Sequence, residues 1–356
     1  MSHQRAFIAM SGGVDSTVAA YLTQQDGIPC MGGTLRLYTG SDTACGSTQD
    51  ALDAEAVAQR LDMPFHLIDA SHCFREKVMD KFVRCYADGL TPSPCIDCNR
   101  YLKFGHLLDT ALALGCTHLV TGHYAQIRHD ETTGRYLLCK AADETKDQSY
   151  FLCMLTQHQL AHTRFPLGGL TKAQVRQIAE DQGFRNARKR DSQDICFLPD
   201  GDHRSFLEEA LGAPFRPGDF LDLAGNVVGQ HQGAIGYTCG QRRGLGLAMG
   251  APVYVCATDT KNNTVTVGPN EALFHRSLKA TDWNFFPFDT LTHPLRVTAK
   301  VRSRMAEQPA TVRPEADGTI TVTFDEPQRA ITPGQSVVLY DGDMVVGGGT
   351  ITQALD

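Results

Sequence analysis

Two groups of residues in this chain have the types and spacing to do chemistry. The first is Ser-Gly-Gly-Val-Asp-Ser at residues 11–16, directly after the apolar run at residues 7–10. Two glycines between an expected strand and an expected helix let the backbone turn tightly and direct several N–H groups at one point. A helix N-terminus adds partial positive charge there, so the segment predicts an anion-binding loop.

This loop is not a Walker A motif, because no Gly-Lys-Ser/Thr follows it. The hydroxyls of Ser11 and Ser16 can donate to a phosphate, and the carboxylate of Asp15 can reach a magnesium ion bound to that phosphate. The arrangement resembles the pyrophosphate loop of enzymes that cleave ATP to AMP and pyrophosphate. The alternative is an ordinary glycine-rich turn, which so specific a hexapeptide disfavours.

The second group consists of cysteines. Cys95 and Cys98 form a Cys-x-x-Cys pair after Thr-Pro-Ser-Pro at residues 91–94, whose prolines stiffen a loop and disfavour helix. We expect Asn99 to cap the next helix, which would place Cys98 near a helix N-terminus that stabilises a thiolate. Cys196 follows a basic cluster and, taken alone, is more typical of a core cysteine.

Three interpretations of the Cys-x-x-Cys pair stay open from the residues alone. It could be half of a zinc site, although no second pair stands at finger spacing. It could be a thioredoxin-like redox pair, although the flanking residues differ from that motif. It could also perform catalytic sulfur chemistry together with the ATP loop.

Composition limits the classes of function. A chain of 356 residues with 42% apolar residues suggests two or three domains with sizeable cores. No segment approaches the roughly 18 apolar residues of a membrane span, and no signal region follows the N-terminus, so we expect a cytoplasmic protein without membrane contact. A net charge of −7 argues against indiscriminate nucleic-acid binding. Local basic clusters remain at Arg185, Arg188, Lys189 and Arg190, and at Arg242 and Arg243.

The elements that must position these residues alternate between strand and helix over the first 200 residues. This pattern predicts a doubly wound parallel sheet with ligands beyond the carboxyl ends of its strands. A hairpin is expected at residues 125–139, with its turn at 131–134. The predicted strands are 6–10, 29–35, 65–69 and 117–121, and the predicted helices are 17–25, 47–61, 73–87, 99–114 and 172–182.

The pattern changes after about residue 205 to short strand-like pieces separated by turn residues. We expect strands at 218–223, 251–257, 264–267, 295–302, 319–324 and 336–340. The chain is therefore divided into an α/β catalytic domain at residues 1–205, a small mixed or β domain at 206–278 and a β-barrel-like domain at 279–356.

Taken together, these motifs resemble one family, the tRNA-specific 2-thiouridylases. The resemblance extends over nearly the whole chain, at residues 9–16, 91–104, 121–125, 146–151, 191–197, 229–233, 238–245 and 333–335. It implies that ATP with Mg²⁺ adenylates the C2 oxygen of uridine 34 in tRNAs of the lysine, glutamate and glutamine type, and that sulfur then replaces this oxygen.

The resemblance also implies roles for the cysteines. Cys196 would carry a persulfide received from a sulfurtransferase or a cysteine desulfurase. Cys98 would act as an acid or base, or would attack the persulfide and leave a Cys98–Cys196 disulfide bond for a reductant to reopen.

The remaining site residues follow from the same resemblance. The target base would leave its stack to enter the site. The ATP site would comprise Ala9, Met10, Ser11, Gly12, Gly13, Val14, Asp15, Ser16, Leu35 and Gly122. The tRNA site would comprise Ser93, Pro94, Cys95, His123, Lys146, Asp147, Gln148, Arg302, Ser303 and Gln335, and the middle domain would also bind tRNA.

Three positions depart from the family pattern: Cys95 stands where Asp is frequent, Leu35 where Met is frequent, and Ser303 where Tyr is common. Cys95 makes a third candidate thiolate beside Cys98 and Cys196, and three cysteines could hold a [4Fe–4S] cluster. Two other functions compete. A nitrogen-transferring ATP pyrophosphatase would not need Cys98 and Cys196, and a zinc- or RNA-binding module would leave the loop at 11–16 unexplained.

Overall fold

The computed structural model describes residues 4–37, 48–189, 195–198 and 202–356. The chain divides into two compact units, each described here by itself. The first unit takes in Met1–Val78, Pro94–Gly201 and Gly342–Val346, and the second takes in Met79–Ser93, Asp202–Asp341 and Gly347–Asp356.

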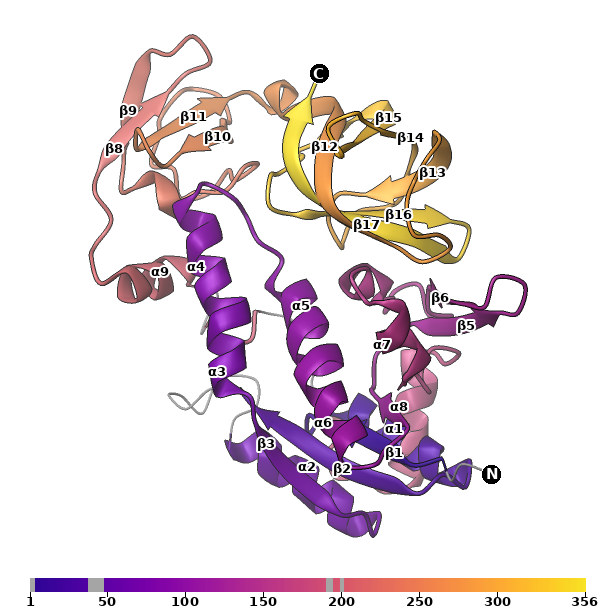
Figure 1. Cartoon of the computed structure of the whole chain (residues 1–356). Helices are drawn as coiled ribbons and strands as arrows, with labels where there is room; N and C mark the ends of the chain where they lie inside the picture. Colours follow the sequence, from indigo (N-terminus) through magenta and orange to yellow (C-terminus); the bar gives the residue numbers. More distant parts are fainter. Residues whose placement is uncertain (1–3, 38–47, 190–194, 199–201) are drawn as a thin grey trace. The chain divides into compact units, whose positions relative to one another are not determined.

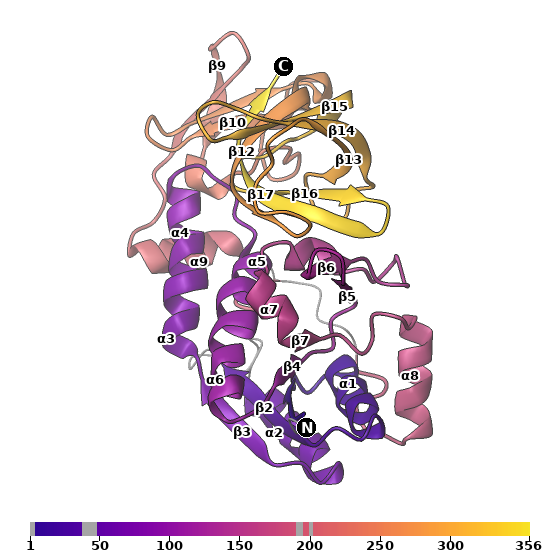
Figure 2. The same cartoon turned by 45° about the vertical axis from the view of Figure 1, so that its right-hand side comes forward.

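The first unit is built on a five-stranded sheet in the order β3-β2-β1-β4-β7, and every pair in it is parallel. Figure 1 labels β1, β2 and β3, and Figure 2 labels β4 and β7. Phe7 and Ile8 on the central strand are both fully buried, and successive strand residues point to opposite faces, so both faces of the sheet are covered. This confirms the doubly wound parallel sheet. The strands are β1 (Ala6–Ala9), β2 (Cys30–Arg36), β3 (Phe65–Asp69), β4 (His118–Val120) and β7 (Thr163–Arg164).

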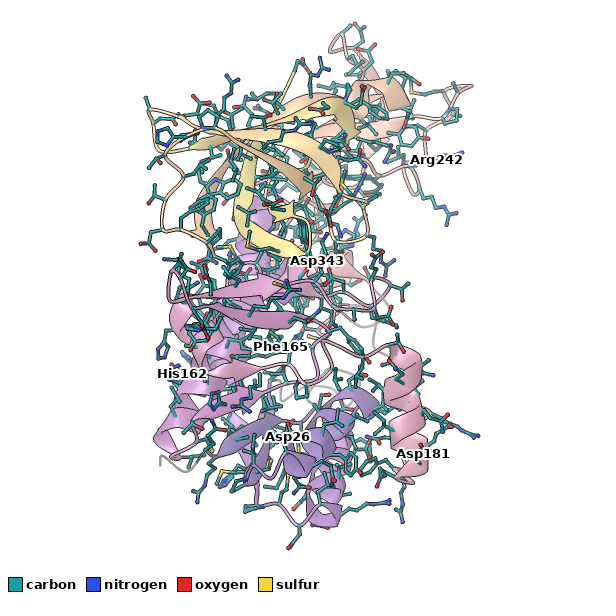
Figure 3. All side chains as sticks on the ribbon, turned by 90° about the vertical axis from the view of Figure 1, so that its right-hand side faces the viewer. Asp26, His162, Phe165, Asp181, Arg242 and Asp343 are labelled. Atoms are coloured by element: carbon teal, nitrogen blue, oxygen red, sulfur yellow. The ribbon has the colours of Figure 1, made fainter. Side chains whose placement is uncertain are left out.

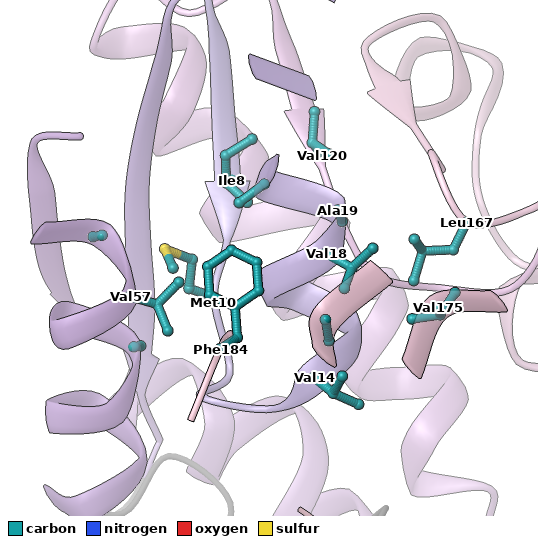
Figure 4. Packing of buried hydrophobic residues seen from close by; sticks show 14 of the residues in the cluster. Ile8, Met10, Val14, Val18, Ala19, Val57, Val120, Leu167, Val175 and Phe184 are labelled. Atoms are coloured by element: carbon teal, nitrogen blue, oxygen red, sulfur yellow. The ribbon is translucent and has the colours of Figure 1, made fainter. Parts of the chain in front are cut away.

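One core joins the sheet to three helices, α1 (Val14–Gln25), α2 (Thr48–Arg60) and α8 (Lys172–Asp181). Figure 4 shows Val18, Val57 and Val175 of these helices in the same cluster as Ile8 of β1. Helices α1 and α8 also contact each other, and they lie side by side in Figure 2. Helix α1 starts three residues before the expected position, so Val14, Asp15 and Ser16 form its first turn.

One helical run precedes the Cys-x-x-Cys pair, and a second contains both of its cysteines. The first consists of α3 (Ser71–Phe74), η1 (Arg75–Met79) and α4 (Asp80–Ala87), and the second of α5 (Pro94–Asp97), η2 (Cys98–Leu107) and α6 (Leu108–Ala113). The second run was expected to begin at 99 with Asn99 as its cap, and this was wrong. Pro94 begins the helix instead, because proline suits a first helical position, where its missing N–H is not needed.

The predicted hairpin is confirmed as β5 (Gln126–Asp130) and β6 (Arg135–Cys139), with its turn at 131–134. Two short helices follow, η3 (Ser149–Leu152) and α7 (Gln157–Ala161). The last part of the first unit, Gly342–Val346, returns to this hairpin, where Met344 pairs with Cys139.

The second unit begins with a small mixed sheet in the order β10-β11-β8-β9, in which β8 and β11 are parallel. Its core contains Phe220, Val255 and Val265. Helix α9 (His203–Leu211) packs on α4, with the rings of Phe82 and Phe206 5.9 Å apart. The other elements here are β8 (Gly218–Leu221), β9 (Val227–His231), η5 (Ala234–Gly236), β10 (Tyr254–Asp259) and β11 (Thr264–Gly268).

The rest of the second unit is an antiparallel barrel in the order β12-β15-β14-β13-β16-β17, closed by pairing between β12 and β17. The barrel predicted from the sequence is therefore confirmed. Its elements are η6 (Asn270–Leu273), β12 (Phe274–Phe285), β13 (Leu295–Lys300), β14 (Gln308–Pro314), β15 (Ile320–Arg329), β16 (Ser336–Asp341) and β17 (Met344–Leu355). Among the described helices, none has the length and apolar character needed to cross a membrane.

Candidate functional site

The glycine-rich loop connects β1 to α1 in a conformation that its sequence requires. Gly12 has φ +71°, and a Cβ atom there would lie 2.7 Å from the carbonyl oxygen of Asp50. The hydroxyl of Ser16 donates to the carbonyl of Gly13 at 3.1 Å and accepts from the backbone amide of Ser11 at 3.2 Å. The hydroxyls therefore brace the loop from within at the N-terminus of α1.

Asp15, in the first turn of α1, has two side-chain partners. The ammonium of Lys172 donates to both carboxylate oxygens, at 2.7 and 2.8 Å, and the hydroxyl of Tyr124 donates to Oδ1 at 2.8 Å. The side chain of Lys172 is only 10% exposed and that of Asp15 is 29% exposed. Sequence reasoning gave neither Lys172 nor Tyr124 a role at this site.

The start of α8 fixes the position of Lys172. Thr171 caps the helix in a capping box with Gln174, and the carboxylate of Asp143 accepts from the backbone amide of Lys172 at 2.9 Å. The Thr-x-x-Gln pattern was therefore a signal in the sequence that could have placed Lys172 at a first helical position.

Gly122, just after β4, packs against the backbone of the loop. A Cβ atom on Gly122 would lie 2.7 Å from the carbonyl carbon of Asp15 and 2.8 Å from the amide nitrogen of Ser16. Asn186 holds the other side, because its Nδ2 donates to the carbonyl of Gly12 at 3.2 Å and to the hydroxyl of Thr17 at 2.8 Å. The structure thus brings Gly122 to the loop.

The segment Lys146-Asp147-Gln148 is joined to the loop through Tyr124. The amide of Tyr124 donates to Oε1 of Gln148 at 3.0 Å, and the amide of Gln148 donates to the carbonyl of Tyr124 at 2.9 Å. Asp147 accepts from the amide of Ala141 at 3.0 Å and from the hydroxyl of Ser149 at 2.7 Å. The side chains of Asp147 and Gln148 therefore hold this segment in place.

Cys98 lies on the helical run that this same segment supports. Nδ2 of Asn99 donates to the carbonyl of Phe151 at 3.0 Å, and the amide of Phe151 donates to the carbonyl of Gln148 at 3.0 Å. Cys98 is 8% exposed, whereas Cys95 is exposed to solvent. Hydrogen bonds therefore connect the loop at 11–16, through Tyr124 and Gln148, to the residue next to Cys98.

Cys196 is half-buried in the same unit. The ring of its neighbour Phe197 meets the ring of Phe74 edge-on at 5.7 Å, and α3, which carries Phe74, contacts the η2 segment that begins with Cys98. Every cysteine of the described residues is a free thiol, so no disulfide bond is present there. Arg190 and residues 191–194 lie outside the described residues.

His123 sits in an aromatic environment, with its ring 5.6 Å from that of Phe104 and 5.9 Å from that of Phe165. Its Nδ1 bonds to the hydroxyl of Thr121 at 2.8 Å. Burial and then the charge of Lys103 hold the pKa of His123 well below its usual range. His123 is therefore neutral near pH 7 and carries no positive charge.

Some residues assigned to the ATP site have buried side chains. Met10 and Val14 lie in the sheet–helix core, as Figure 4 shows. Leu35 is also buried, near the end of β2, whereas Ala9, the last residue of β1, is half-buried. At Met10 and Val14 the main chain is the part left to meet a ligand.

Four residues assigned to tRNA belong to the second unit. Nε2 of Gln335 donates to the carbonyls of Thr91 and Pro92, at 3.1 Å each, and the hydroxyl of Ser93 donates to its Oε1 at 3.4 Å. Gln335 thus holds the three residues that precede Pro94 in the chain. Arg302 donates to the carbonyl of Arg329 at 3.0 Å, and Ser303 is half-buried in the following turn.

The basic clusters differ in how far they are neutralised. Lys189 pairs with Asp50 at 3.0 Å and with Asp53 at 2.9 Å, and together with Arg185 it lines a cavity of about 610 Å³ beside α2. Arg242, by contrast, is exposed, and Figure 3 shows its side chain extending from the surface. The exposed cations of the second unit are therefore better placed for phosphates than Lys189.

Comparisons with known proteins agree along the whole chain. Residues 4–200 match the model of the tRNA methyl transferase HUP domain, residues 204–269 that of the tRNA methyl transferase PRC-barrel domain, and residues 275–351 that of the aminomethyltransferase beta-barrel domain. A tRNA-specific 2-thiouridylase MnmA of Clostridioides difficile is 45% identical over 99% of this chain and 99% of its own. That of Moorella thermoacetica is 48% identical over 97% of this chain and 98% of its own.

A solved structure is also similar, at a much greater distance. The U34-tRNA thiolase NcsA of Methanococcus maripaludis, with its [4Fe–4S] cluster, is 18% identical and has a TM-score of 0.35, covering 58% of this chain and 63% of that one. A likeness this remote carries no argument about a cluster in the present chain.

Proposed function

The chain belongs to the tRNA-specific 2-thiouridylase family, and on this premise we propose how its own residues replace the C2 oxygen of uridine 34 with sulfur. As a member it is a sulfurtransferase that uses ATP and modifies tRNA. The observation that carries the proposal is the chain of hydrogen bonds from Asp15 through Tyr124 and Gln148 to Phe151 and Asn99, which joins the loop to the helix of Cys98.

The first step takes place at the loop. The backbone amides at the start of α1 bind the phosphates of ATP, and Asp15 supplies a carboxylate that suits Mg²⁺. The C2 oxygen of the uridine attacks the α-phosphorus, the bond to the β-phosphate breaks and pyrophosphate leaves. The close packing of Gly122 against Asp15 and Ser16 supports this assignment, because it fixes the position of the loop.

The second step transfers sulfur. The terminal sulfur of a Cys196 persulfide attacks C2, and AMP leaves with the original oxygen. The Cys98 thiolate then attacks the Cys196 sulfur, so that the S–S bond of the persulfide breaks and the sulfur stays on C2. A disulfide between Cys98 and Cys196 remains, and a dithiol reductant supplies the two electrons that reopen it. The ring contact of Phe197, next to Cys196, with Phe74 on α3 and the contact between α3 and η2 support this route.

The alternative route would use a [4Fe–4S] cluster held by Cys95, Cys98 and Cys196. All three residues lie in the described part of the chain, and the structure finds no group of three or more His, Cys, Asp or Glu there that could hold a metal ion. The two cysteines of the pair also differ in burial, since Cys95 is exposed to solvent and Cys98 is buried. These observations support the persulfide route.

The remaining assignments extend the proposal to tRNA and to a partner. The residues that would contact tRNAs of the lysine, glutamate and glutamine type are Ser93, Pro94, Cys95, His123, Lys146, Asp147, Gln148, Arg302, Ser303 and Gln335. The sulfur donor would be a persulfide-carrying sulfurtransferase or a cysteine desulfurase. We divide the chain at about 205 and 278, and the bounds of the three family models, 4–200, 204–269 and 275–351, support this division.

Mass spectrometry of tRNA nucleosides tests the proposal. The protein is incubated with tRNA, ATP, Mg²⁺ and a persulfide source, in air and after anaerobic purification. We expect 2-thiouridine at position 34 in both preparations, together with one AMP for each base modified. Product formed only by the anaerobic, iron-containing protein would favour the cluster route, and ATP turnover without any thiolated nucleoside would overturn the function.

A further inference from the structure

Lys172 has no part in the function proposed above, yet it occupies a costly position. Its ammonium is at hydrogen-bond distance from both oxygens of Asp15, and its side chain is 10% exposed. Withdrawing a lysine from water costs several kcal/mol unless an anion and hydrogen bonds offset the cost. Asp15 supplies that anion in the nucleotide-free chain.

Binding of Mg²⁺ and ATP changes the charge balance at this point. If the carboxylate of Asp15 turned toward the metal ion, the ammonium of Lys172 would give up its two hydrogen bonds to that carboxylate. Asp15 is in the first turn of α1, so phosphate oxygens bound at the N-terminus of this helix would lie beside it. The pyrophosphate part of ATP is therefore the anion within reach.

From this geometry we propose that Lys172 is a phosphate-binding residue of the thiolation reaction. When ATP binds, the ammonium of Lys172 would exchange the carboxylate of Asp15 for the β- and γ-phosphates. This inference rests on the proposed function and adds a residue to it. As the bond between the α- and β-phosphates breaks, negative charge accumulates on the leaving pyrophosphate. A cation fixed beside that charge stabilises the transition state more than the bound substrate.

The surroundings of Lys172 favour an exchange of side-chain partners over movement of the backbone. The capping box at Thr171 and the bond to Asp143 hold the main chain of Lys172. The ring of Tyr124 lies under the ammonium, with its centroid 5.7 Å away, and its hydroxyl holds Asp15. Gly122 holds the backbone of Asp15. Only the ends of the two side chains need to move.

Calorimetric titration of the full chain with AMP, ATP and inorganic pyrophosphate, each with Mg²⁺, tests the proposal. Lys172→Met removes the charge and keeps most of the length, so we expect affinity for ATP and pyrophosphate to fall roughly tenfold or more, as for loss of a charge-assisted bond. AMP, which lacks the β- and γ-phosphates, should bind as before. The matched control is Lys77→Met, since Lys77 is half-exposed and pairs with the neighbouring Glu76.

Two results would overturn the proposal. The first is that Lys172→Met binds pyrophosphate with wild-type affinity. The second is that Lys172→Met loses affinity for AMP and ATP equally, which would mean that Lys172 is only a counter-ion of Asp15. Lys172→Arg keeps the charge and should retain the preference for ATP over AMP, so it provides the test should Lys172→Met fail to fold. A wild-type chain that discriminates ATP from AMP through Lys172 but makes no 2-thiouridine would refute the proposed function and leave this inference standing.

Discussion

Gln148 and Tyr124 exchange two hydrogen bonds, one through the side-chain oxygen of Gln148 and one through its backbone amide. Tyr124 in turn holds Asp15, and the carbonyl of Gln148 accepts from Phe151, whose own carbonyl accepts from Asn99. The loop proposed for ATP, the segment proposed for tRNA and the helix of Cys98 are therefore parts of one connected structure. Such networks are rigid when every member is satisfied. Within the described residues one atom of this network is not satisfied, since the buried Oδ1 of Asn99 has no hydrogen-bond partner.

Asp15→Asn should abolish AMP formation, because an amide is a poor ligand for Mg²⁺. It should also lower the free energy of unfolding by roughly 1–3 kcal/mol, because Lys172 would lose its carboxylate partner. The loss is smaller than for a fully buried ion pair, since the side chain of Asp15 is 29% exposed. The measurements are AMP release and thermal melting without nucleotide. A variant that releases AMP at the wild-type rate would remove Asp15 from the mechanism.

Gly122→Ala should weaken ATP binding and destabilise the fold by about 1–3 kcal/mol, as overpacking does. The reason is that the added Cβ would lie 2.7 Å from the carbonyl carbon of Asp15. Gly169→Ala is the matched control, because nothing lies within 4 Å of a Cβ at that position. Equal nucleotide affinity of the two variants would mean that the loop at residues 11–16 shifts to accommodate the methyl group without loss of ATP binding.

Cys98→Ser and Cys196→Ser should each eliminate 2-thiouridine and leave adenylation intact, because the thiols take part only in the sulfur step. Cys95→Ser should keep most of the activity on the persulfide route. The readouts are nucleoside mass spectrometry, AMP release and bound iron. Combined loss of iron and activity in Cys95→Ser would support the cluster, and full activity in Cys196→Ser would exclude both routes.

His123→Phe should make stability less dependent on pH in mildly acidic solution. The folded chain holds the pKa of His123 well below the 6.5 of an unperturbed histidine, mainly through burial. Below about pH 6.5 the unfolded chain therefore binds a proton that the folded chain does not, and stability falls as the pH decreases. Denaturant unfolding at pH 7.5 and 5.5 measures how far the free energy of unfolding changes with pH. The same change in the wild type and in His123→Phe would contradict the lowered pKa of His123.

The affinity for tRNA should fall between about 50 and 200 mM salt, with a modest slope because few cations are grouped together. If Arg242 contacts a phosphate, Arg242→Gln should reduce the slope of the logarithm of the binding constant against the logarithm of the salt concentration by about 1. Lys189→Gln should change it little, since Asp50 and Asp53 already neutralise that lysine. Fluorescence anisotropy with labelled tRNA provides the measurement, and salt-independent binding would argue against phosphate contacts.

The sequence predicted many elements of both units because their signals are local, whereas it gave no expectation for β7, α9, β9, β12, β14 and β17. Apolar runs fixed the strands around Ile8 and Leu119, and the turn residues between Asp130 and Arg135 fixed the hairpin. The motif at residues 11–16 also predicted the loop, since its glycine at a positive φ and its hydroxyls act over a few residues.

The errors and omissions have physical causes as well. Asn99 has the character of a capping residue, but Pro94 begins the helix five residues earlier and Asn99 donates instead to Phe151. Lys172 was missed because its partner Asp15 is 157 positions away in the chain. A pair so distant leaves no periodic trace in one sequence, and only the order of the strands brings it together.

The separation between Asp15 and Lys172 also has a consequence for the newly made protein. Synthesis proceeds from the N-terminus, so the loop leaves the ribosome long before α8, which both carries Lys172 and packs on α1. Until then the carboxylate of Asp15 has no lysine beside it, and α1 lacks part of its apolar cover. A nascent chain can therefore form the pair of Asp15 and Lys172, and with it the phosphate site proposed here, only after α8 has been translated.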